Sequence, residues 1–254
     1  MPHHLRFAPV GLLLFVVGCW HGNPNSSLKS MPSGTGFTVH STKSSGEDHK
    51  YSVFVPRDYS PSRKYPTIVF LHGIGESGGD GVKCTTVGIG PAIAKRDGNF
   101  PFIVVFPQYG WDWTSDKAGK LVLDVLDDAE KQYSIDADCV TLTGMSSGGE
   151  GTWVLGARYP ERWSALVPMA GDSSVKDVPK LTKMPIWALH NSGDFIVGVG
   201  NTRDMYKRIK AAGGNIQYKE YGSIGHNCWD EAYDQGELFE WMQKQRRNKT
   251  TAAK

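Results

Sequence analysis

The sequence predicts an α/β fold in which helices cover both faces of a mostly parallel central sheet. Short, continuous apolar runs, which are typical of strands buried on both faces, alternate along the chain with stretches whose apolar residues recur at helical spacing. The segments directly after the apolar runs are rich in Gly, His, Ser, Asp and Trp. Because parallel sheets bind ligands at the carboxyl ends of their strands, we expect the chemistry at this edge.

The elements follow one another in strand and helix order after an initial hairpin. Residues 37–41 and 51–55 alternate apolar and polar side chains, as half-buried hairpin strands do. The expected buried strands cover residues 67–71, 102–106, 140–143, 165–169 and 186–189, and a further strand covers 216–221. The expected helices cover 89–96, 121–133, 149–159, 202–212 and about 231–244. Strand and helix in repeated alternation imply crossover connections and a parallel sheet.

Length and composition indicate a globular protein. The chain has 254 residues, of which 39% are hydrophobic and 21% charged, so a disordered chain, a coiled coil and a polytopic membrane protein are excluded. Its 28 Lys and Arg nearly balance its 26 Asp and Glu. A nucleic-acid-binding protein normally has a clustered basic surplus, and we therefore expect no nucleic-acid partner.

The amino-terminal segment predicts export. Residues 7–18 are apolar but too few for a spanning helix of about 20 residues, so residues 1–18 are predicted to be a signal peptide. The run Val16-Val17-Gly18-Cys19 resembles a bacterial lipobox, and we expect a lipid on Cys19 to anchor the protein at a membrane, in the periplasm or at the cell surface. Cleavage near Gly18 or Gly22 with secretion is the alternative.

The remaining segments are assigned by composition. Residues 19–36 are mostly small and polar and are predicted to be a flexible tether. Residues 37–247 are predicted to form a single catalytic domain, and residues 248–254 a disordered tail.

Three cysteines fall within the predicted domain, which allows at most one disulfide in an oxidising compartment. Cys139 begins an apolar strand and is interpreted as a buried free thiol. This leaves Cys84 and Cys228 as the candidate bridge, with two separate free cysteines as the alternative. The chain has no CxxC or HExxH spacing, and neither a metal nor a cofactor is predicted.

The segment Gly144-Met145-Ser146-Ser147-Gly148 matches the pattern G-x-S-x-G between an apolar strand and a helix. A sharp strand-to-helix turn needs small residues two positions before and after its centre. The turn would expose the Ser146 hydroxyl, while the amide of Ser147 and the helix dipole would favour negative charge on a bound carbonyl oxygen. Ser146 is therefore the predicted nucleophile and Ser147 a predicted oxyanion-hole donor. A glycine-rich helix start capped by Ser146 is the alternative.

A serine hydroxyl needs a base to activate it and a third group to orient that base. His226 lies in a loop after the last strand, which agrees with the hydrolase order of nucleophile, acid and histidine. His72 and His190 directly end strands and are expected to support loops. Asp194 is the predicted acid, and Asp172, after the preceding strand, is its rival.

Residues 65 to about 241 resemble α/β-hydrolases of the phospholipase/carboxylesterase and predicted-peptidase branch, near the polyhydroxybutyrate-depolymerase-like and feruloyl esterases. The matching segments are His72-Gly73-Ile74-Gly75-Glu76, residues 144–149, residues 190–194 followed by Ile196-Val197, and Gly225-His226-Asn227-Cys228-Trp229. The resemblance implies an α/β-hydrolase fold. It also implies that the backbone of Ile74, with Gly75 as second choice, supplies the other oxyanion-hole donor. Asn191 and Gly198 stand where many relatives have Gly and Pro.

The short polar segment between Asp172 and Met184 leaves no room for a cap domain, so we expect an open site. Trp111, Trp113 and Trp229 lie on loops at the carboxyl edge and are predicted to contact substrate, with packing as the alternative. We expect a serine esterase that cleaves small-molecule or polysaccharide-linked carboxylic esters through an acyl-enzyme, without a cofactor. A peptidase of the same fold and a non-catalytic surface lipoprotein that binds glycans or a partner are the alternatives.

Overall fold

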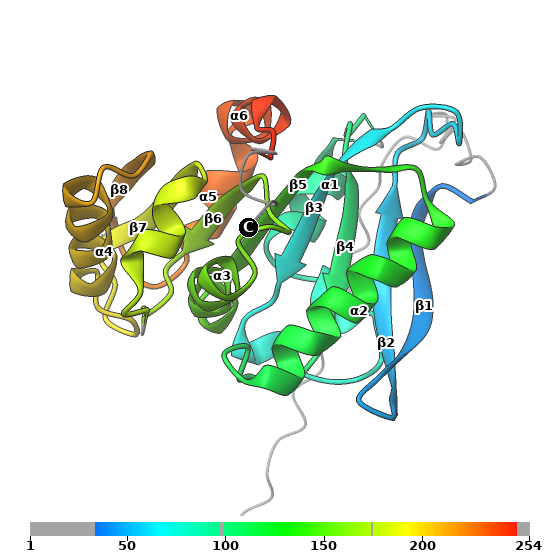
Figure 1. The fold of residues 1–254 in the computed structure, drawn as a ribbon, viewed down its shortest axis with the longest axis horizontal. Helices are drawn as coiled ribbons and strands as arrows, with labels where there is room; N and C mark the ends of the chain where they lie inside the picture. Colours follow the sequence, from blue (N-terminus) through cyan, green and yellow to red (C-terminus); the bar gives the residue numbers. More distant parts are fainter. Residues whose placement is uncertain (1–33, 97–98, 174, 248–254) are drawn as a thin grey trace, which may run out of the picture. The chain divides into compact units, whose positions relative to one another are not determined.

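The computed structural model describes residues 34–96, 99–173 and 175–247, and within these residues eight strands form one sheet (Figure 1). The strands are β1 (Gly36–Ser44), β2 (Glu47–Val55), β3 (Tyr65–Leu71), β4 (Ile103–Pro107), β5 (Ile135–Met145), β6 (Ala165–Met169), β7 (Ile186–Gly193) and β8 (Ile216–Ile224). Their order across the sheet is β1-β2-β4-β3-β5-β6-β7-β8. The β1–β2 and β2–β4 pairs are antiparallel and all later neighbours are parallel, so the predicted mostly parallel sheet is confirmed.

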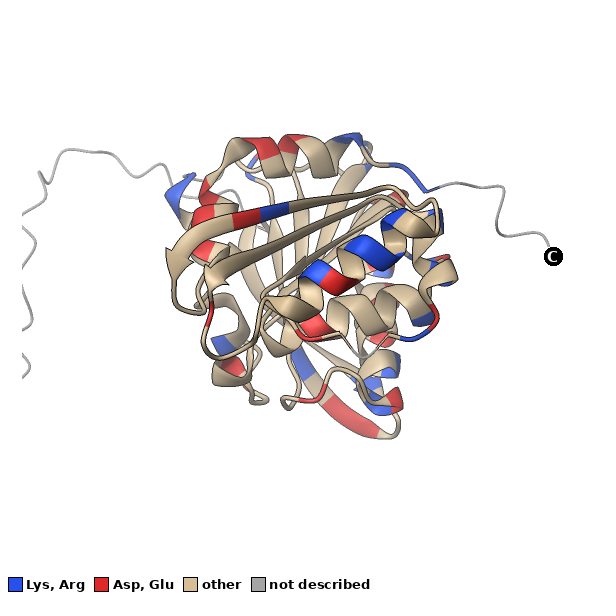
Figure 2. Cartoon of the chain, turned by 90° about the vertical axis from the view of Figure 1, so that its left-hand side faces the viewer, with Lys and Arg blue, Asp and Glu red and all other residues tan. Residues whose placement is uncertain are grey.

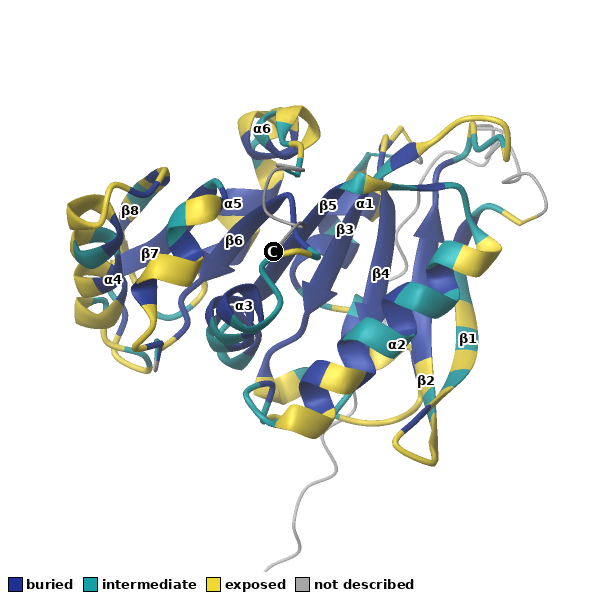
Figure 3. Cartoon of the chain, in the orientation of Figure 1, coloured by how far each residue is buried: buried dark blue, intermediate teal, exposed yellow. Residues whose placement is uncertain are grey.

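Helices cover both faces of the sheet. They are α1 (Ile89–Lys95), α2 (Asp116–Gln132), α3 (Ser147–Arg158), α4 (Gly200–Ala211), α5 (Trp229–Asp234) and α6 (Gly236–Lys244), with short 3-10 helices η1 (Ile74–Glu76), η2 (Lys83–Thr85) and η3 (Val178–Lys183). Apolar residues of α2, α3 and α4 form one buried cluster with the sheet. Those of α1, α5 and α6 form a second. The central strands are therefore buried on both faces, as Figure 3 shows for β4, β5 and β6.

Two helices differ from their predicted bounds by more than two residues, for local reasons. Helix α2 begins at Asp116, five residues before the expected start at 121, because the Ser115 hydroxyl accepts a hydrogen bond from the Ala118 amide and caps the helix. The predicted final helix is divided into α5 and α6, because Gln235 adopts an extended conformation directly before Gly236. Among the described residues between β6 and β7 the only helix is the short η3, so the expected absence of a cap domain holds there.

The described residues belong to one compact unit that contains the whole sheet. Strand β1 begins at Gly36, one residue before the expected domain boundary at 37. The predicted signal peptide, Cys19, most of the tether and the tail over 248–254 lie outside the described residues. Within the part of the chain that the structure describes, no helix combines the length and the apolar character needed to cross a bilayer. Basic and acidic residues are intermixed on the side that Figure 2 shows.

The three cysteines of the described chain are free and buried. The candidate bridge between Cys84 and Cys228 is therefore wrong, and the alternative of separate thiols is confirmed. The two side chains contact different parts of the backbone: the Cys84 thiol is 3.6 Å from the Phe106 carbonyl oxygen, whereas the Cys228 thiol is 3.7 Å from that of Leu189. Cys139, interpreted as a buried free thiol, is one.

Candidate active site

The turn between β5 and α3 has the sharp geometry that its glycines predicted. Ser146 has φ 56° and ψ −121°, a conformation that is unfavourable for a residue with a Cβ. A Cβ on Gly148 would lie 2.0 Å from the Leu71 carbonyl oxygen, and one on Gly144 would lie 2.3 Å from the Gly148 carbonyl oxygen. Because both obstacles are backbone atoms, only glycine fits at either position. The turn places Ser146 at the carboxyl edge of the sheet.

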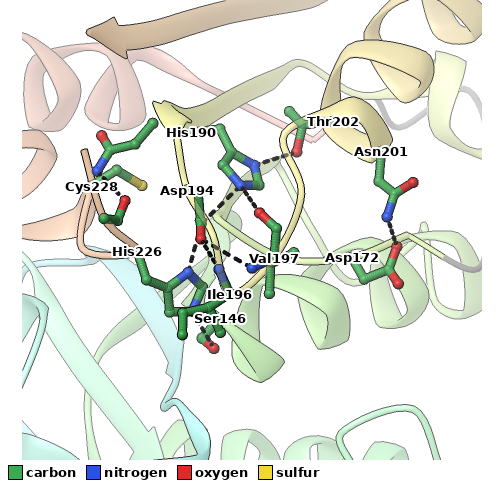
Figure 4. A network of polar contacts seen from close by, with 12 residues as sticks. Ser146, Asp172, His190, Asp194, Ile196, Val197, Asn201, Thr202, His226 and Cys228 are labelled. Carbon is green, nitrogen blue, oxygen red and sulfur yellow. Dashed lines mark hydrogen bonds and ion pairs between the residues drawn. The ribbon is translucent and has the colours of Figure 1, made fainter. Parts of the chain in front are cut away.

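Ser146, His226 and Asp194 form a continuous chain of hydrogen bonds (Figure 4). The distance from Ser146 Oγ to His226 Nε2 is 2.7 Å, and that from His226 Nδ1 to Asp194 Oδ2 is 2.6 Å. An ionised carboxylate only accepts hydrogen bonds, so Nδ1 carries the proton and Nε2 is free to accept one from the serine. The structure thus brings together three side chains that are distant in the sequence, since Ser146 and His226 are separated by 80 positions. This arrangement can activate a hydroxyl as a nucleophile.

The Asp194 carboxylate is completely buried yet well supplied with donors. Its Oδ1 accepts hydrogen bonds from the amides of Ile196 and Val197 at 2.9 and 3.0 Å. Burial alone would raise the pKa of Asp194, but the hydrogen bond from His226 and these two amides outweigh it, so the pKa lies below its ordinary value. The group is therefore ionised at neutral pH and can stabilise a protonated imidazole.

The rival acid, Asp172, faces a different neighbour. Its carboxylate is exposed and accepts hydrogen bonds from the Asn201 side chain at 2.5 Å and the Ser173 amide at 2.6 Å. In Figure 4 it lies on the far side of residues 194–199, the acid loop between β7 and α4, from His226. The geometry therefore favours Asp194.

The other two strand-end histidines support loops, as expected. His72 is buried, and its Nδ1 donates to the Gly73 carbonyl at 2.7 Å while its Nε2 accepts from the Tyr109 amide at 3.2 Å. His190 is also buried, but it additionally contacts Asp194. Sequence reasoning missed this second contact, although the four-residue spacing between His190 and Asp194 was visible.

Two backbone segments flank the nucleophile where an oxyanion hole would form. Ser147 is the first residue of α3, so its amide has no partner within the helix. The loop after β3 also lies close to the nucleophile, since a Cβ on Gly73 would lie 3.6 Å from Ser146 Cβ. Ile74 follows Gly73 and begins η1. The two predicted donors, the amides of Ile74 and Ser147, thus belong to two backbone segments that both lie next to Ser146.

The three tryptophans have different environments. Trp111 is 63% exposed, whereas Trp113 is fully buried. Trp113 donates from Nε1 to the His72 carbonyl at 3.0 Å and packs edge-on against the His72 ring. The predicted substrate contact of Trp113 is therefore wrong, because the close approach of α3 at Gly151 holds it in the core. Trp229 is 9% exposed and lies at right angles to the His226 ring, 5.2 Å away.

Exposed apolar side chains gather at the carboxyl edge. Five of the eight large apolar side chains that the structure describes as exposed lie on loops or strand ends there: Ile74, Trp111, Phe195, Ile196 and Ile224. Phe195 and Ile196 directly follow the catalytic acid candidate in the chain. Within the described residues, no group of three His, Cys, Asp or Glu side chains is arranged to hold a metal ion.

Comparison with known proteins gives relatives among esterases. No protein-family model matches the chain. The chain is 24% identical over 170 residues to a bifunctional acetylxylan esterase/xylanase of Neocallimastix patriciarum. The aligned region covers 65% of this chain and 24% of that protein. It is also 27% identical over 208 residues to an uncharacterized secreted protein of Arthroderma benhamiae, and this aligned region covers 66% of this chain and 22% of that protein. The chain thus spans about a quarter of the length of these curated relatives.

Solved structures show the fold directly. A thermostable esterase superposes with a TM-score of 0.76 at 30% identity, over 83% of this chain and 63% of that one. Acylaminoacyl peptidases and feruloyl or ferulic acid esterases, which are 12 to 18% identical, superpose with TM-scores of 0.63 to 0.65. The chain has the α/β-hydrolase fold, and the resemblance seen in its sequence motifs is confirmed.

Proposed function

We propose that the protein is a serine esterase that hydrolyses carboxylic esters through an acyl-enzyme intermediate. Ser146 is the nucleophile, His226 the general base and Asp194 the acid that orients the base. The observation that carries this proposal is the unbroken series of hydrogen bonds from Ser146 Oγ through the imidazole to a buried carboxylate. An acetylxylan esterase among the relatives and an esterase among the structures of the same fold support it.

The reaction follows from this geometry. His226 Nε2 takes the Ser146 proton as Oγ attacks the ester carbonyl carbon, and the carbonyl oxygen becomes an oxyanion that the amides of Ile74 and Ser147 stabilise. The imidazolium then protonates the leaving alcohol oxygen, which breaks the ester bond and leaves the acyl group on Ser146. Water attacks the acyl-enzyme with His226 again as base, and the products are a carboxylic acid and the free serine.

The open, apolar edge suits small-molecule or polysaccharide-linked esters. The described residues between β6 and β7 place no domain over Ser146, so a bulky alcohol component has access to the site. Trp111, Phe195 and Ile196 present exposed apolar surface on loops at the same edge of the sheet. The acetylxylan esterase relative supports a sugar-linked substrate. A peptidase is the second candidate, because acylaminoacyl peptidases share the fold.

Export belongs to the same proposal. The secreted relative supports it, and the run ending at Cys19 supports a lipid anchor. The mass of the mature amino terminus decides between the two forms: a diacylglyceryl Cys19 indicates an anchored lipoprotein, whereas an unmodified terminus after cleavage near Gly18 or Gly22 indicates secretion.

The test compares p-nitrophenyl esters of short acids with aminoacyl p-nitroanilides, for the wild type and Ser146→Ala. We expect ester hydrolysis that Ser146→Ala abolishes. Efficient anilide cleavage without ester hydrolysis would replace the esterase by the peptidase. Absence of turnover on both, together with no reaction of Ser146 with a fluorophosphonate, would favour a non-catalytic binding protein.

A further inference from the structure

The buried carboxylate that faces the base is held by a second histidine. His190 Nε2 lies 3.1 Å from Asp194 Oδ2, the oxygen that His226 Nδ1 contacts at 2.6 Å (Figure 4). The same Nε2 lies 2.9 Å from the Val197 carbonyl oxygen, and His190 Nδ1 lies 2.8 Å from Thr202 Oγ1. The His190 ring is fully buried. Every polar atom of this ring therefore has a partner in the acid loop or at the start of α4.

These partners determine where the proton of His190 sits. The Asp194 carboxylate and the Val197 carbonyl can only accept, so Nε2 carries the proton and donates to both. Nδ1 of the neutral ring then accepts from the Thr202 hydroxyl. Burial lowers the pKa of His190, which favours this neutral form. The Thr202 hydroxyl can donate or accept, so it adapts to the tautomer that the two acceptors at Nε2 impose.

We propose that His190 is a positioning residue for the reaction. Its Nε2–H keeps Asp194 in the orientation that meets His226, and it takes up part of the negative charge of the carboxylate. The inference rests on the proposed function, since it assigns Asp194 the role of orienting the base. With His190, four donors share this carboxylate: two imidazoles and the amides of Ile196 and Val197.

The charge sharing has a measurable consequence. Without the His190 donor, the carboxylate would concentrate more charge on the hydrogen bond to His226 and would stabilise the protonated imidazole more strongly. A protonated imidazole cannot accept the Ser146 proton. Reactivity of Ser146 in the wild type is therefore expected to persist to lower pH than in a variant that lacks this donor.

Three other groups face this network. Hydrogen bonds from Arg203 lower the pKa of Glu220, beside His190 on β8, to about 2. Burial raises the pKa of Cys228 to about 12. Neither group therefore changes charge between mildly acidic and neutral pH. Glu231 on α5 faces Cys228, and the variant Glu231→Gln serves as the control for its charge.

The test compares His190→Leu, which keeps the bulk of the ring but removes the donor, with His190→Gln, whose amide N–H can reach the position of Nε2. The measurement is the rate at which a fluorophosphonate labels Ser146 as a function of pH, together with the thermal unfolding of each variant. We expect His190→Leu to be labelled about tenfold more slowly at neutral pH. Asp194, still held by the amides of Ile196 and Val197, keeps its hydrogen bond to His226 but orients the base less closely towards Ser146. Its acidic limb should lie at higher pH, while His190→Gln and Glu231→Gln should follow the wild type.

The outcomes separate this inference from the proposed function. A wild type that is not labelled contradicts the function itself. If the wild type is labelled, and His190→Leu folds and is labelled at the same rate and with the same pH profile, the inference is overturned. A structural role alone would lower only the unfolding temperature. If His190→Leu does not fold, His190→Asn decides, because the shorter amide can meet Thr202 at the position of Nδ1 but cannot reach Asp194 at the position of Nε2. Its acidic limb should lie at higher pH than that of the wild type, and an unshifted limb overturns the inference.

Discussion

Ser146 shows how a single strained residue can serve a reaction. Its backbone conformation costs about 1 to 3 kcal/mol and is held by two hydrogen bonds, from its amide to the Met169 carbonyl and from the Glu150 amide to its own carbonyl, at 3.0 and 3.1 Å. In return, Oγ points at His226 rather than into the helix. The strained turn therefore directs the hydroxyl to His226, the base that we propose.

At this scale we predict that Ser146 and His226 act as a unit. Ser146→Ala and His226→Ala should each lower kcat by about 10⁴-fold or more, and the double variant should be little worse than either, because each change removes the same proton transfer. Ester hydrolysis under saturating substrate measures the three values. Losses that multiply in the double variant would contradict the assignment.

The positions of some site residues could be predicted from the sequence, whereas the burial and contacts of others could not. Ser146, Asp194 and His226 could be placed because each follows a strand of the predicted sheet, and parallel strands bring such positions to one edge. The burial of Trp113 could not be predicted, because it depends on the space that Gly151 leaves on a helix distant in the chain. The contact between His190 and Asp194 depends on the path of the acid loop, which strand order does not determine.

Among the elements, the turn from β5 to α3 depends most on backbone contact. Gly148→Ala should lower the free energy of unfolding by more than about 3 kcal/mol or prevent folding, because its Cβ would meet the backbone of β3 at 2.0 Å. The matched control is Gly222→Ala on β8, where an added Cβ has open space. Urea denaturation compares the two, and equal stabilities would contradict the account of the turn.

Helix α4 and strand β8 are joined by a charged contact whose strength depends on pH. Glu220 accepts hydrogen bonds from Arg203 and from Tyr218, and they lower its pKa from 4.5 to about 2. Because the pKa is lower in the folded state, the contact stabilises the fold above about pH 4.5, and this contribution disappears as the pH falls towards 2.

Glu220→Gln should therefore lower the free energy of unfolding by less than about 1 kcal/mol at neutral pH, since the pair is partly exposed, and by only a small part of that amount near pH 2. Denaturation curves at both pH values measure the difference, with Glu240→Gln at an exposed position of α6 as control. A difference that is equal at both pH values would show that Glu220 acts through packing alone.

The bounds of elements were harder to predict than their existence. All five predicted buried strands are present, because continuous apolar runs leave few alternatives. The start of α2 was missed because Ser115 caps the helix in a polar stretch without helical periodicity. The break between α5 and α6 was missed because apolar residues recur at helical spacing on both sides of it, at 229, 232 and 233 and again at 238, 239 and 242.

In the molecule as a whole, two apolar clusters on opposite faces of the sheet hold the strand ends in register, and within the described residues no disulfide contributes.

We predict that Cys84, Cys139 and Cys228 are all modified by iodoacetamide in denaturant without a reductant, because each is a free thiol. In the native state they should react slowly, since burial raises the pKa of each thiol, largest for Cys84 and Cys228. Peptide mass spectrometry measures the modification in both states. Two cysteines that are modified in denaturant only after a reductant is added would form a disulfide, which would contradict the structure.

The central claim is that Ser146 is made nucleophilic by His226, which Asp194 orients. Its most direct test is the reaction of the purified protein with a fluorophosphonate, followed by tandem mass spectrometry of the labelled peptide. The account predicts a single adduct on Ser146, none in Ser146→Ala, and strongly slowed labelling in His226→Ala. An adduct on another residue, or labelling of Ser146 at the same rate without His226, would contradict it.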